Sequence, residues 1–276
     1  MNENIRDTIL AVSVVAIVMT IGFGGMFLYS GQTTPYSVVV SGSMQHGNES
    51  SVGTIDTGDV VVVRQLSKVG GMDEIKSYVD GYHQNYSKFS EYGDVIIYER
   101  NGNKNPVIHR PIVWLDWNES TDSWDAPSLD GFPGWSVTSG NADGTNMTGI
   151  LTMTDIGFSN KTVRLDLDLL ASRSKTDGFA TLGDSVGNTN FDQMSGIIST
   201  LVGDGMIKYV AGFEIPWIGS IKMYIDGNPN VSQIPSNSIP NLIAFMIGIL
   251  ILVTAVFIIA EEAPSVIRNC MKKKRR

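Results

Sequence analysis

Two long apolar stretches without a charged residue constrain this chain more than any other feature of its sequence. Thr8 to Tyr29 and Leu242 to Ala260 each hold about 20 residues, and a helix of that length spans the roughly 30 Å hydrocarbon core of a bilayer. One such stretch could be a buried core helix, but two at opposite ends of one chain favour membrane spans. We therefore predict transmembrane helices over residues 8–29 and 241–260.

The flanking charges predict the orientation of these helices. The first stretch is longer than the apolar region of a cleaved secretory signal, about 7–15 residues, and residues 1–7 before it are not strongly positive, so an uncleaved anchor is favoured. Basic residues crowd the C-terminal tail 261–276, which the positive-inside tendency places in the cytoplasm. Residues 1–7 are then cytoplasmic too, and residues 30–240 are expected outside, in a multi-pass protein of the cell membrane.

The composition of this outer segment narrows the possible functions. It holds 24 Asp and Glu against 13 Lys and Arg, so it lacks the basic footprint of a nucleic-acid-binding domain. The single cysteine, Cys270, lies in the tail, and no cluster has metal-ligand or nucleotide-binding spacing, so we predict no disulfide, metal or cofactor. Acceptor patterns for N-glycosylation occur at Asn48, Asn85, Asn118, Asn146, Asn160 and Asn230.

Short β-branched runs bounded by turn residues recur through the outer segment and predict a mostly β domain, as a sandwich or partly open barrel. These runs are 36–44, 56–64, 92–100, 106–115 and 178–184, with a strand, turn and strand over 212–219. Two insertions interrupt them. Residues 67–91 are polar with weak helical character, and residues 117–176 are polar but contain three tryptophans and an alternating run, which predicts a folded β-rich insertion.

The turn Ser41-Gly42-Ser43-Met44 is the first candidate for chemistry, although Ser-Gly-Ser alone is common in loops and a serine needs a neighbouring base. Further motifs follow it in order along the chain. They are Thr57-Gly-Asp-Val-Val-Val-Val63, Gly93-Asp-Val-Ile-Ile-Tyr98, Val107-Ile-His-Arg110, Thr181-Leu-Gly-Asp184 and Ile215-Pro-Trp-Ile-Gly219. Together with the N-terminal apolar stretch, this set resembles the signal peptidase I family, in the archaeal and endoplasmic-reticulum branch that has histidine where the bacterial branch has lysine.

The resemblance implies roles for individual residues. Ser43 would be the nucleophile and His109 the general base that later returns the proton to the leaving amine. An acid would orient the imidazole: Asp192 is expected, and Asp184 stays an alternative because the spacing between the two is longer than the family's usual pattern. The backbone N–H of Ser43 and the hydroxyl of Ser41 would hold the oxyanion.

The resemblance also implies a signal-peptidase-like β fold and a substrate. The expected activity is that of a membrane-bound serine endopeptidase that removes N-terminal signal peptides from exported preproteins, with small residues before the cut. The groove walls would include Val38, Val39, Val40 and Met44. The expected partners are these preproteins and the lipid bilayer, with the protein translocation machinery as a further candidate.

Two departures from the family pattern leave alternatives open. Gln45 and His46 stand where the family commonly has an acidic or apolar residue and then proline, so the loop after Ser43 is expected to be looser. His46 is also close enough in sequence to be a rival base. The insertion 117–176 lengthens the gap between base and acid, and the alternative function is a catalytically inactive, glycosylated surface interaction domain on the same scaffold.

Overall fold

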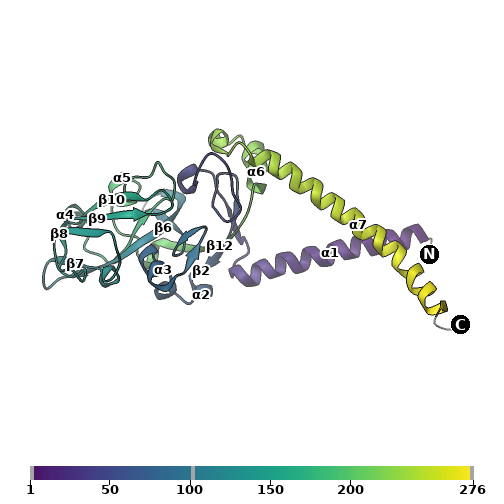
Figure 1. Ribbon diagram of the computed structural model, residues 1–276, viewed down its shortest axis with the longest axis horizontal. Coiled ribbons are helices and arrows are strands. Elements are labelled where there is room, and N and C mark those ends of the chain that lie inside the picture. The colour runs from purple at the N-terminus through teal and green to yellow at the C-terminus, as the bar shows by residue number, and fades with distance from the viewer. Residues whose placement is uncertain (1–2, 101–102, 274–276) are drawn as a thin grey trace.

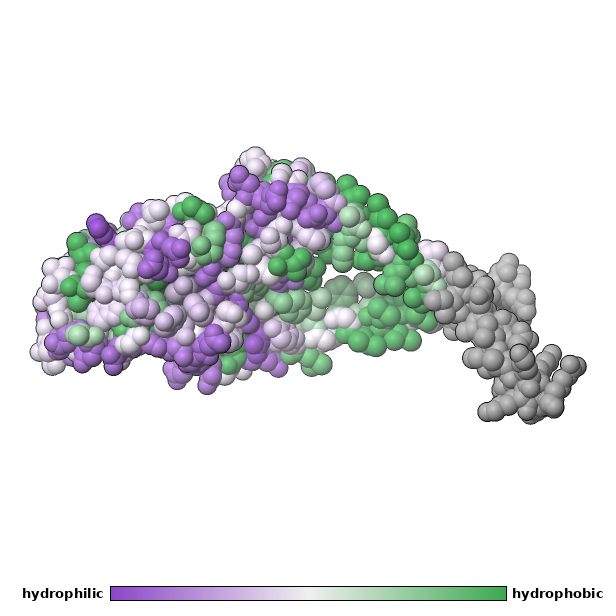
Figure 2. Space-filling view, in the orientation of Figure 1, coloured by the Kyte–Doolittle hydropathy of each residue, from purple (hydrophilic) through white to green (hydrophobic). Residues whose placement is uncertain are grey.

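The computed structural model describes residues 3–100 and 103–273 as a β-rich body with two long helices, which leave it on the same side (Figure 1). They are α1 (Glu3–Ser30) and α7 (Ser238–Lys273). Within them, Val12–Ser30 and Ser238–Val256 are long and apolar enough to cross a membrane. Their side chains are almost all exposed, as the apolar surface in Figure 2 shows, whereas a core helix would be buried. The two helices are therefore consistent with association with a membrane.

A seven-stranded antiparallel sheet organises the body. Its path runs β1-β2-β12-β5-β6-β11, and β7 pairs with β6. The strands are β1 (Tyr36–Val38), β2 (Val60–Gln65), β5 (Ile96–Arg100), β6 (Asn103–Asn118), β7 (Ser123–Asp125), β11 (Gly178–Leu182) and β12 (Ile207–Ile215). The four valines that begin β2 are all buried, because this strand is internal to the sheet and covered on both faces.

The repeated Gly-Asp pair precedes β2 and β5, as the sequence predicts. Gly93 has a φ of +78°, a conformation that favours glycine. The aspartates then accept hydrogen bonds from loops beside each strand: Asp59 from the N–H of Trp217 at 2.8 Å, and Asp94 from the N–H of Lys76 at 3.0 Å. Each pair therefore starts a strand and ties a distant loop to it.

The two interrupting stretches are both folded. Residues 67–91 hold short elements, namely α2 (Leu66–Val69), η2 (Met72–Glu74), α3 (Tyr78–Gln84), β3 (Ser87–Lys88) and β4 (Glu91–Tyr92). Residues 117–176 are β-rich and include β8 (Trp135–Ser139), β9 (Thr148–Ile156) and β10 (Lys161–Asp166), with η3 (Pro127–Leu129) and α4 (Leu167–Arg173). The insertion shares one continuous apolar core with the main sheet, so it is an integral part of the body.

The chain after β11 contains short helical elements and one departure from the sequence prediction. The elements are α5 (Asp192–Ser195), η4 (Asp204–Met206), α6 (Ile218–Ile225) and η5 (Pro229–Gln233). The second strand expected within 212–219 is wrong, because the chain turns at Trp217, whose φ is +64°, and begins α6. A short apolar run fits a strand or a helix equally well, so the pattern could not decide between them.

Candidate active site

Ser43 lies on a 3-10 turn, η1 (Gly42–Met44), that follows β1. Successive side chains on such a turn point about 120° apart, so neighbours face different surroundings. Ser43 lines a cavity of about 640 Å³, whereas Met44 is 1% exposed and packs in the apolar core. The predicted place of Met44 in the groove is therefore wrong, and this side chain instead anchors the turn from behind.

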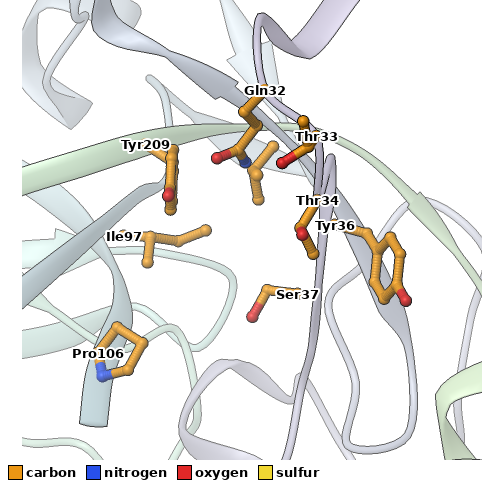
Figure 3. Close-up of a pocket in the computed structure, with 9 residues that line it drawn as sticks. Gln32, Thr33, Thr34, Tyr36, Ser37, Ile97, Pro106 and Tyr209 are labelled. Atoms are coloured by element: carbon orange, nitrogen blue, oxygen red, sulfur yellow. The ribbon is translucent and has the colours of Figure 1, made fainter. Parts of the chain in front are cut away.

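The cavity beside Ser43 lies between β1 and the first half of β6. Val38, Val39 and Val40 line it, together with Ser41 and residues 105–109. A second cavity, of about 370 Å³, lies where the chain leaves α1 (Figure 3). The residues that line both cavities are Ser37, Ile97 and Pro106. The hollow therefore follows β1 from Ser43 toward the end of α1.

His109 and Asp192 form a buried pair. His109 lies on β6, opposite Ile96 of β5, and Asp192 begins α5. The Nδ1 atom of His109 lies 2.7 Å from Oδ2 of Asp192, and each residue is 2% exposed. A carboxylate only accepts hydrogen bonds, so in the neutral imidazole Nδ1 carries the proton and Nε2 keeps its lone pair. The contact thus fixes the tautomer that a general base requires.

Two hydroxyl groups bind the same oxygen of Asp192. The hydroxyls of Tyr98 and Thr181 donate to Oδ2 at 2.7 Å and 2.6 Å. The antiparallel register places Tyr98, His109 and Thr181 on one face of β5, β6 and β11. Burial, and then the charge of Asp192, raise the pKa of Tyr98, so its phenol stays a donor. Three donors therefore converge on one oxygen and stabilise its negative charge.

Ser43 and the free nitrogen of His109 meet at Gly183. A Cβ atom at Gly183 would lie 2.4 Å from the carbonyl oxygen of Ser43 and 2.8 Å from Nε2 of His109, so only glycine leaves them room. The Ser43 carbonyl accepts hydrogen bonds from the N–H of Ser185 at 3.0 Å and from Nδ2 of Asn188 at 2.7 Å. The loop after β11 therefore fixes the backbone of Ser43 beside the imidazole.

The hydroxyl of Ser43 lies near that of Ser41, with 3.4 Å between the two Oγ atoms. Among the hydrogen bonds of the described residues, none joins Ser43 Oγ to His109. Such bonds are often long in a free enzyme and shorten when substrate binds. Rotation about the single Cα–Cβ bond of Ser43 re-aims its hydroxyl within a cavity that both residues line.

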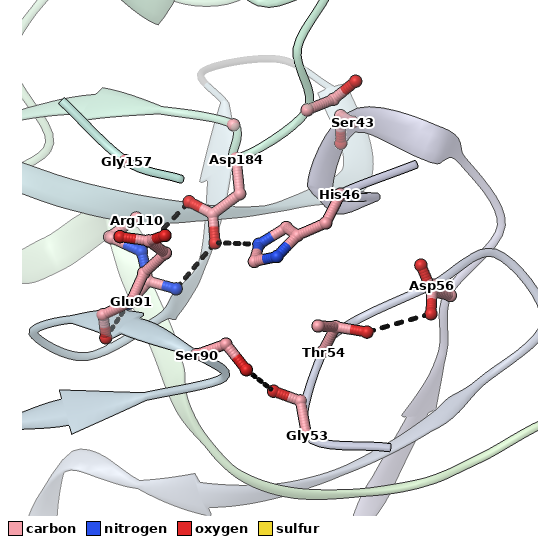
Figure 4. Close-up of polar contacts among 12 residues, drawn as sticks. Ser43, His46, Gly53, Thr54, Asp56, Ser90, Glu91, Arg110, Gly157 and Asp184 are labelled. Carbon is pink, nitrogen blue, oxygen red and sulfur yellow. Dashed lines mark hydrogen bonds and ion pairs between the residues drawn. The ribbon is translucent and has the colours of Figure 1, made fainter. Parts of the chain in front are cut away.

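Asp184 belongs to a different pair. Nε and Nη2 of Arg110 donate to its two carboxylate oxygens at 3.0 Å and 2.6 Å, and Nε2 of His46 lies 3.7 Å from Oδ2 (Figure 4). Burial alone would raise the pKa of Asp184, but the charge of Arg110 and the hydrogen bonds from His46 and Arg110 together outweigh burial and hold that pKa well below its usual range. Of the two candidate acids, Asp192 contacts His109, whereas Asp184 locks its loop to β6.

The loop after Ser43 is tied down although it lacks the proline of the family pattern. The ring of His46 stacks on Phe158 with 4.1 Å between centroids and 17° between planes. Oε1 of Gln45 accepts a hydrogen bond from Thr57 at 2.5 Å. His46 is therefore engaged with Phe158 and Asp184, and it does not line the cavity that contains Ser43.

Residues 230–237, which lead into α7, run along the loop that bears Ser43. We call this segment the juxtamembrane strap. Four of its residues hydrogen-bond to the loop at 2.7–3.4 Å. The pairs are Asn230 with Val40, Gln233 with Gly42, Ser236 with Asn48 and Asn237 with Ser50. The strap therefore ties α7 to the chain on both sides of the turn that bears Ser43.

The sequence assigns no role to several of these residues. Tyr98, Arg110 and Thr181 lie inside the motifs quoted above, but nothing in those motifs shows which atom each side chain reaches. Asn188 carries no local signal. Among residues 3–100 and 103–273, no three His, Cys, Asp or Glu side chains are grouped to hold a metal ion.

No protein-family model matches this chain, and no curated protein matches it. The chemistry of the site is therefore what supports a function.

Proposed function

We propose that this chain is a membrane-bound serine endopeptidase of the signal peptidase I type, with Ser43 as nucleophile and His109 as general base. The buried contact between Nδ1 of His109 and Asp192, at 2.7 Å, carries the proposal. In the neutral imidazole this contact directs the lone pair of Nε2 toward the backbone of Ser43, where Gly183 provides the space. A histidine that only filled the core would not need its second nitrogen beside a serine in an open cavity.

In the proposed reaction, His109 takes the proton of Ser43 Oγ as that oxygen attacks the peptide carbonyl, and then gives it to the leaving amine. The N–H of Ser43 and the hydroxyl of Ser41 hold the oxyanion. Asp192 stays ionised and stabilises the imidazolium that forms. Water then releases the acyl group from Ser43 by the same proton transfers.

The proposed substrate is an extended peptide whose apolar segment lies in the bilayer, as in the signal peptide of an exported preprotein. Two observations support it. The cavities follow β1 from Ser43 toward α1, one of the two helices that could span a membrane. In addition, β1 is the edge strand of the sheet, and an extended peptide can pair with such an edge.

The proposal includes the finer features that the resemblance implies. The β-rich body is of the signal-peptidase type, residues 30–240 lie on the outer side, and both termini are cytoplasmic. Small side chains precede the cut, and the protein translocation machinery delivers the preprotein. Tethering confines enzyme and cleavage site to the same thin layer at the membrane surface, which raises their effective concentration.

The test uses the full chain in lipid vesicles with a labelled preprotein. We expect Ser43→Ala and His109→Ala each to lower the cleavage rate by at least about 10³-fold, because either loss removes the activated nucleophile. Ser136→Ala and His83→Ala are matched controls at exposed positions and should cleave normally. Full activity in Ser43→Ala, or no cleavage by the unchanged chain, would refute the proposal; the second result fits an inactive interaction domain.

A further inference from the structure

The β-rich insertion places one buried lysine against the loop that holds Ser43. Lys161, the first residue of β10, is 7% exposed. Its Nζ donates to the carbonyl oxygens of Gly183, Asp184 and Ser185 at 3.0, 2.9 and 3.1 Å. An ammonium group has three donors, so these three bonds satisfy it completely.

These three carbonyls belong to the residues that position the nucleophile. The N–H of Ser185 donates to the carbonyl of Ser43, and Gly183 leaves the gap between Ser43 and the imidazole of His109. An unbroken series of contacts therefore runs from Lys161 through the loop to the backbone of Ser43. Peptide planes carry their N–H and C=O groups together, so fixing three successive carbonyls also fixes the direction of the N–H groups.

The same hairpin of the insertion also reaches the loop that follows Ser43. Phe158 lies in the connection between β9 and β10, and its ring stacks on His46 at 4.1 Å. The insertion thus contacts two loops that adjoin Ser43, one through Phe158 and one through Lys161.

We propose that Lys161 is a positioning residue for the reaction, which holds the loop after β11 so that Ser43 stays beside His109. This inference rests on the proposed chemistry of Ser43 and His109. Lys161 is not itself the base, because its three donors are committed to backbone carbonyls. A lysine that only satisfied a buried turn would affect stability and leave the reactivity of Ser43 unchanged.

The test compares Lys161→Met with Lys175→Met in the full chain in vesicles. Lys175 is a matched control, since it lies in the same insertion but is 49% exposed. The readouts are the rate at which a fluorophosphonate probe labels Ser43, kcat and KM for a preprotein, and the thermal unfolding midpoint. We expect labelling and kcat of folded Lys161→Met to fall at least about tenfold with little change in KM, because a misplaced nucleophile slows the chemical step.

A second variant covers the case in which Lys161→Met does not fold. Asn188→Ala, at a half-exposed position, removes one of the two hydrogen bonds to the Ser43 carbonyl and should reproduce the loss of labelling. If Lys161→Met folds and is labelled at the wild-type rate, the inference is overturned. If Lys161→Met does not fold, wild-type labelling of Asn188→Ala overturns it instead. The inference also fails if Lys161→Met lowers the labelling rate but His109→Ala does not, because the effect would then not act through His109. The probe reacts with Ser43 without a preprotein. If the wild-type chain is labelled but cleaves no preprotein, only the proposed substrate is refuted, and the inference about Lys161 can still be tested.

Discussion

Replacing Asp192 by asparagine separates the role of its charge from that of its shape. In the unchanged chain, His109, Tyr98 and Thr181 all donate to one oxygen of this carboxylate at 2.6–2.7 Å. Asparagine is almost isosteric, so the fold should persist. The negative charge is lost, however, and an amide group offers N–H donors where only acceptors stood.

The expected loss of rate in Asp192→Asn depends on how the introduced amide is oriented. If its oxygen faces His109, the imidazolium loses one charge-assisted hydrogen bond, worth about 1.5–3 kcal/mol, or about 10- to 150-fold in rate. If its nitrogen faces His109, Nε2 takes the proton and the base is lost, at about 10⁴-fold. The hydroxyls of Tyr98 and Thr181 can rotate to accept, so both orientations are accessible. We therefore expect kcat to fall by between about 10- and 10⁴-fold, with KM nearly unchanged because Asp192 does not line the cavity.

Asp184→Asn is the matched comparison. It breaks the buried pair with Arg110, which is 1% exposed, and should lower the free energy of unfolding by about 3–5 kcal/mol. The assay measures single-turnover cleavage of a preprotein, normalised to the fraction of folded protein found by chemical unfolding. Asp192→Asn should lose rate per folded molecule, whereas Asp184→Asn should chiefly lose folded protein. If Asp184→Asn loses more rate per folded molecule than Asp192→Asn, the wrong acid has been assigned.

Three further outcomes are expected. Burial raises the pKa of Asp59 to about 7, so between pH 4 and 7 the folded state binds more protons than the unfolded state, and the free energy of unfolding should fall as the pH rises. Asp59→Asn should flatten this pH dependence in denaturant titrations, and an unchanged slope would contradict the assignment. Gly183→Ala should lower kcat at least about 100-fold, because its methyl group would enter the space between Ser43 and His109, and normal cleavage would mean that the two need not meet there. His46→Ala should keep kcat within about threefold and lose about 1 kcal/mol of stability with its ring stack, whereas a loss as large as that of His109→Ala would make His46 the base.

The parts of the site that the sequence could predict are those with a local signal. The Gly-Asp pairs before β2 and β5 predict strand starts, because a positive φ and a side-chain acceptor are needed at each turn. The apolar stretches predict α1 and α7 by length and composition alone. The family resemblance of the ordered motifs predicts Ser43, His109 and Asp192, with Asp184 as the alternative acid, and the structure brings the first three to one place.

The remaining contacts depend on strand register and on packing between distant segments. Tyr98 and Thr181 reach Asp192 only because β5 and β11 flank β6 in a particular register, and β11 carries an irregularity beside Thr181. Alternation along one strand cannot specify the pairing with another. Lys161 was part of a predicted β insertion, but its three carbonyl partners lie more than twenty residues away in sequence. The sequence does not predict helix α6, because the short run at its start fits a strand or a helix equally well.

The juxtamembrane strap determines where this polypeptide can be shortened. A soluble fragment that ends before Asn230 would keep every strand but lose the hydrogen bonds of the strap to Val40, Gly42 and Ser50. Such a fragment should fold with Ser43 misaligned. A fragment that ends after Asn237 keeps those bonds, although it loses the buried Ser238 and Leu242 at the start of α7. Trimming from the C-terminus should therefore leave the alignment of Ser43 unchanged as far as position 237 and disturb it within the next few residues.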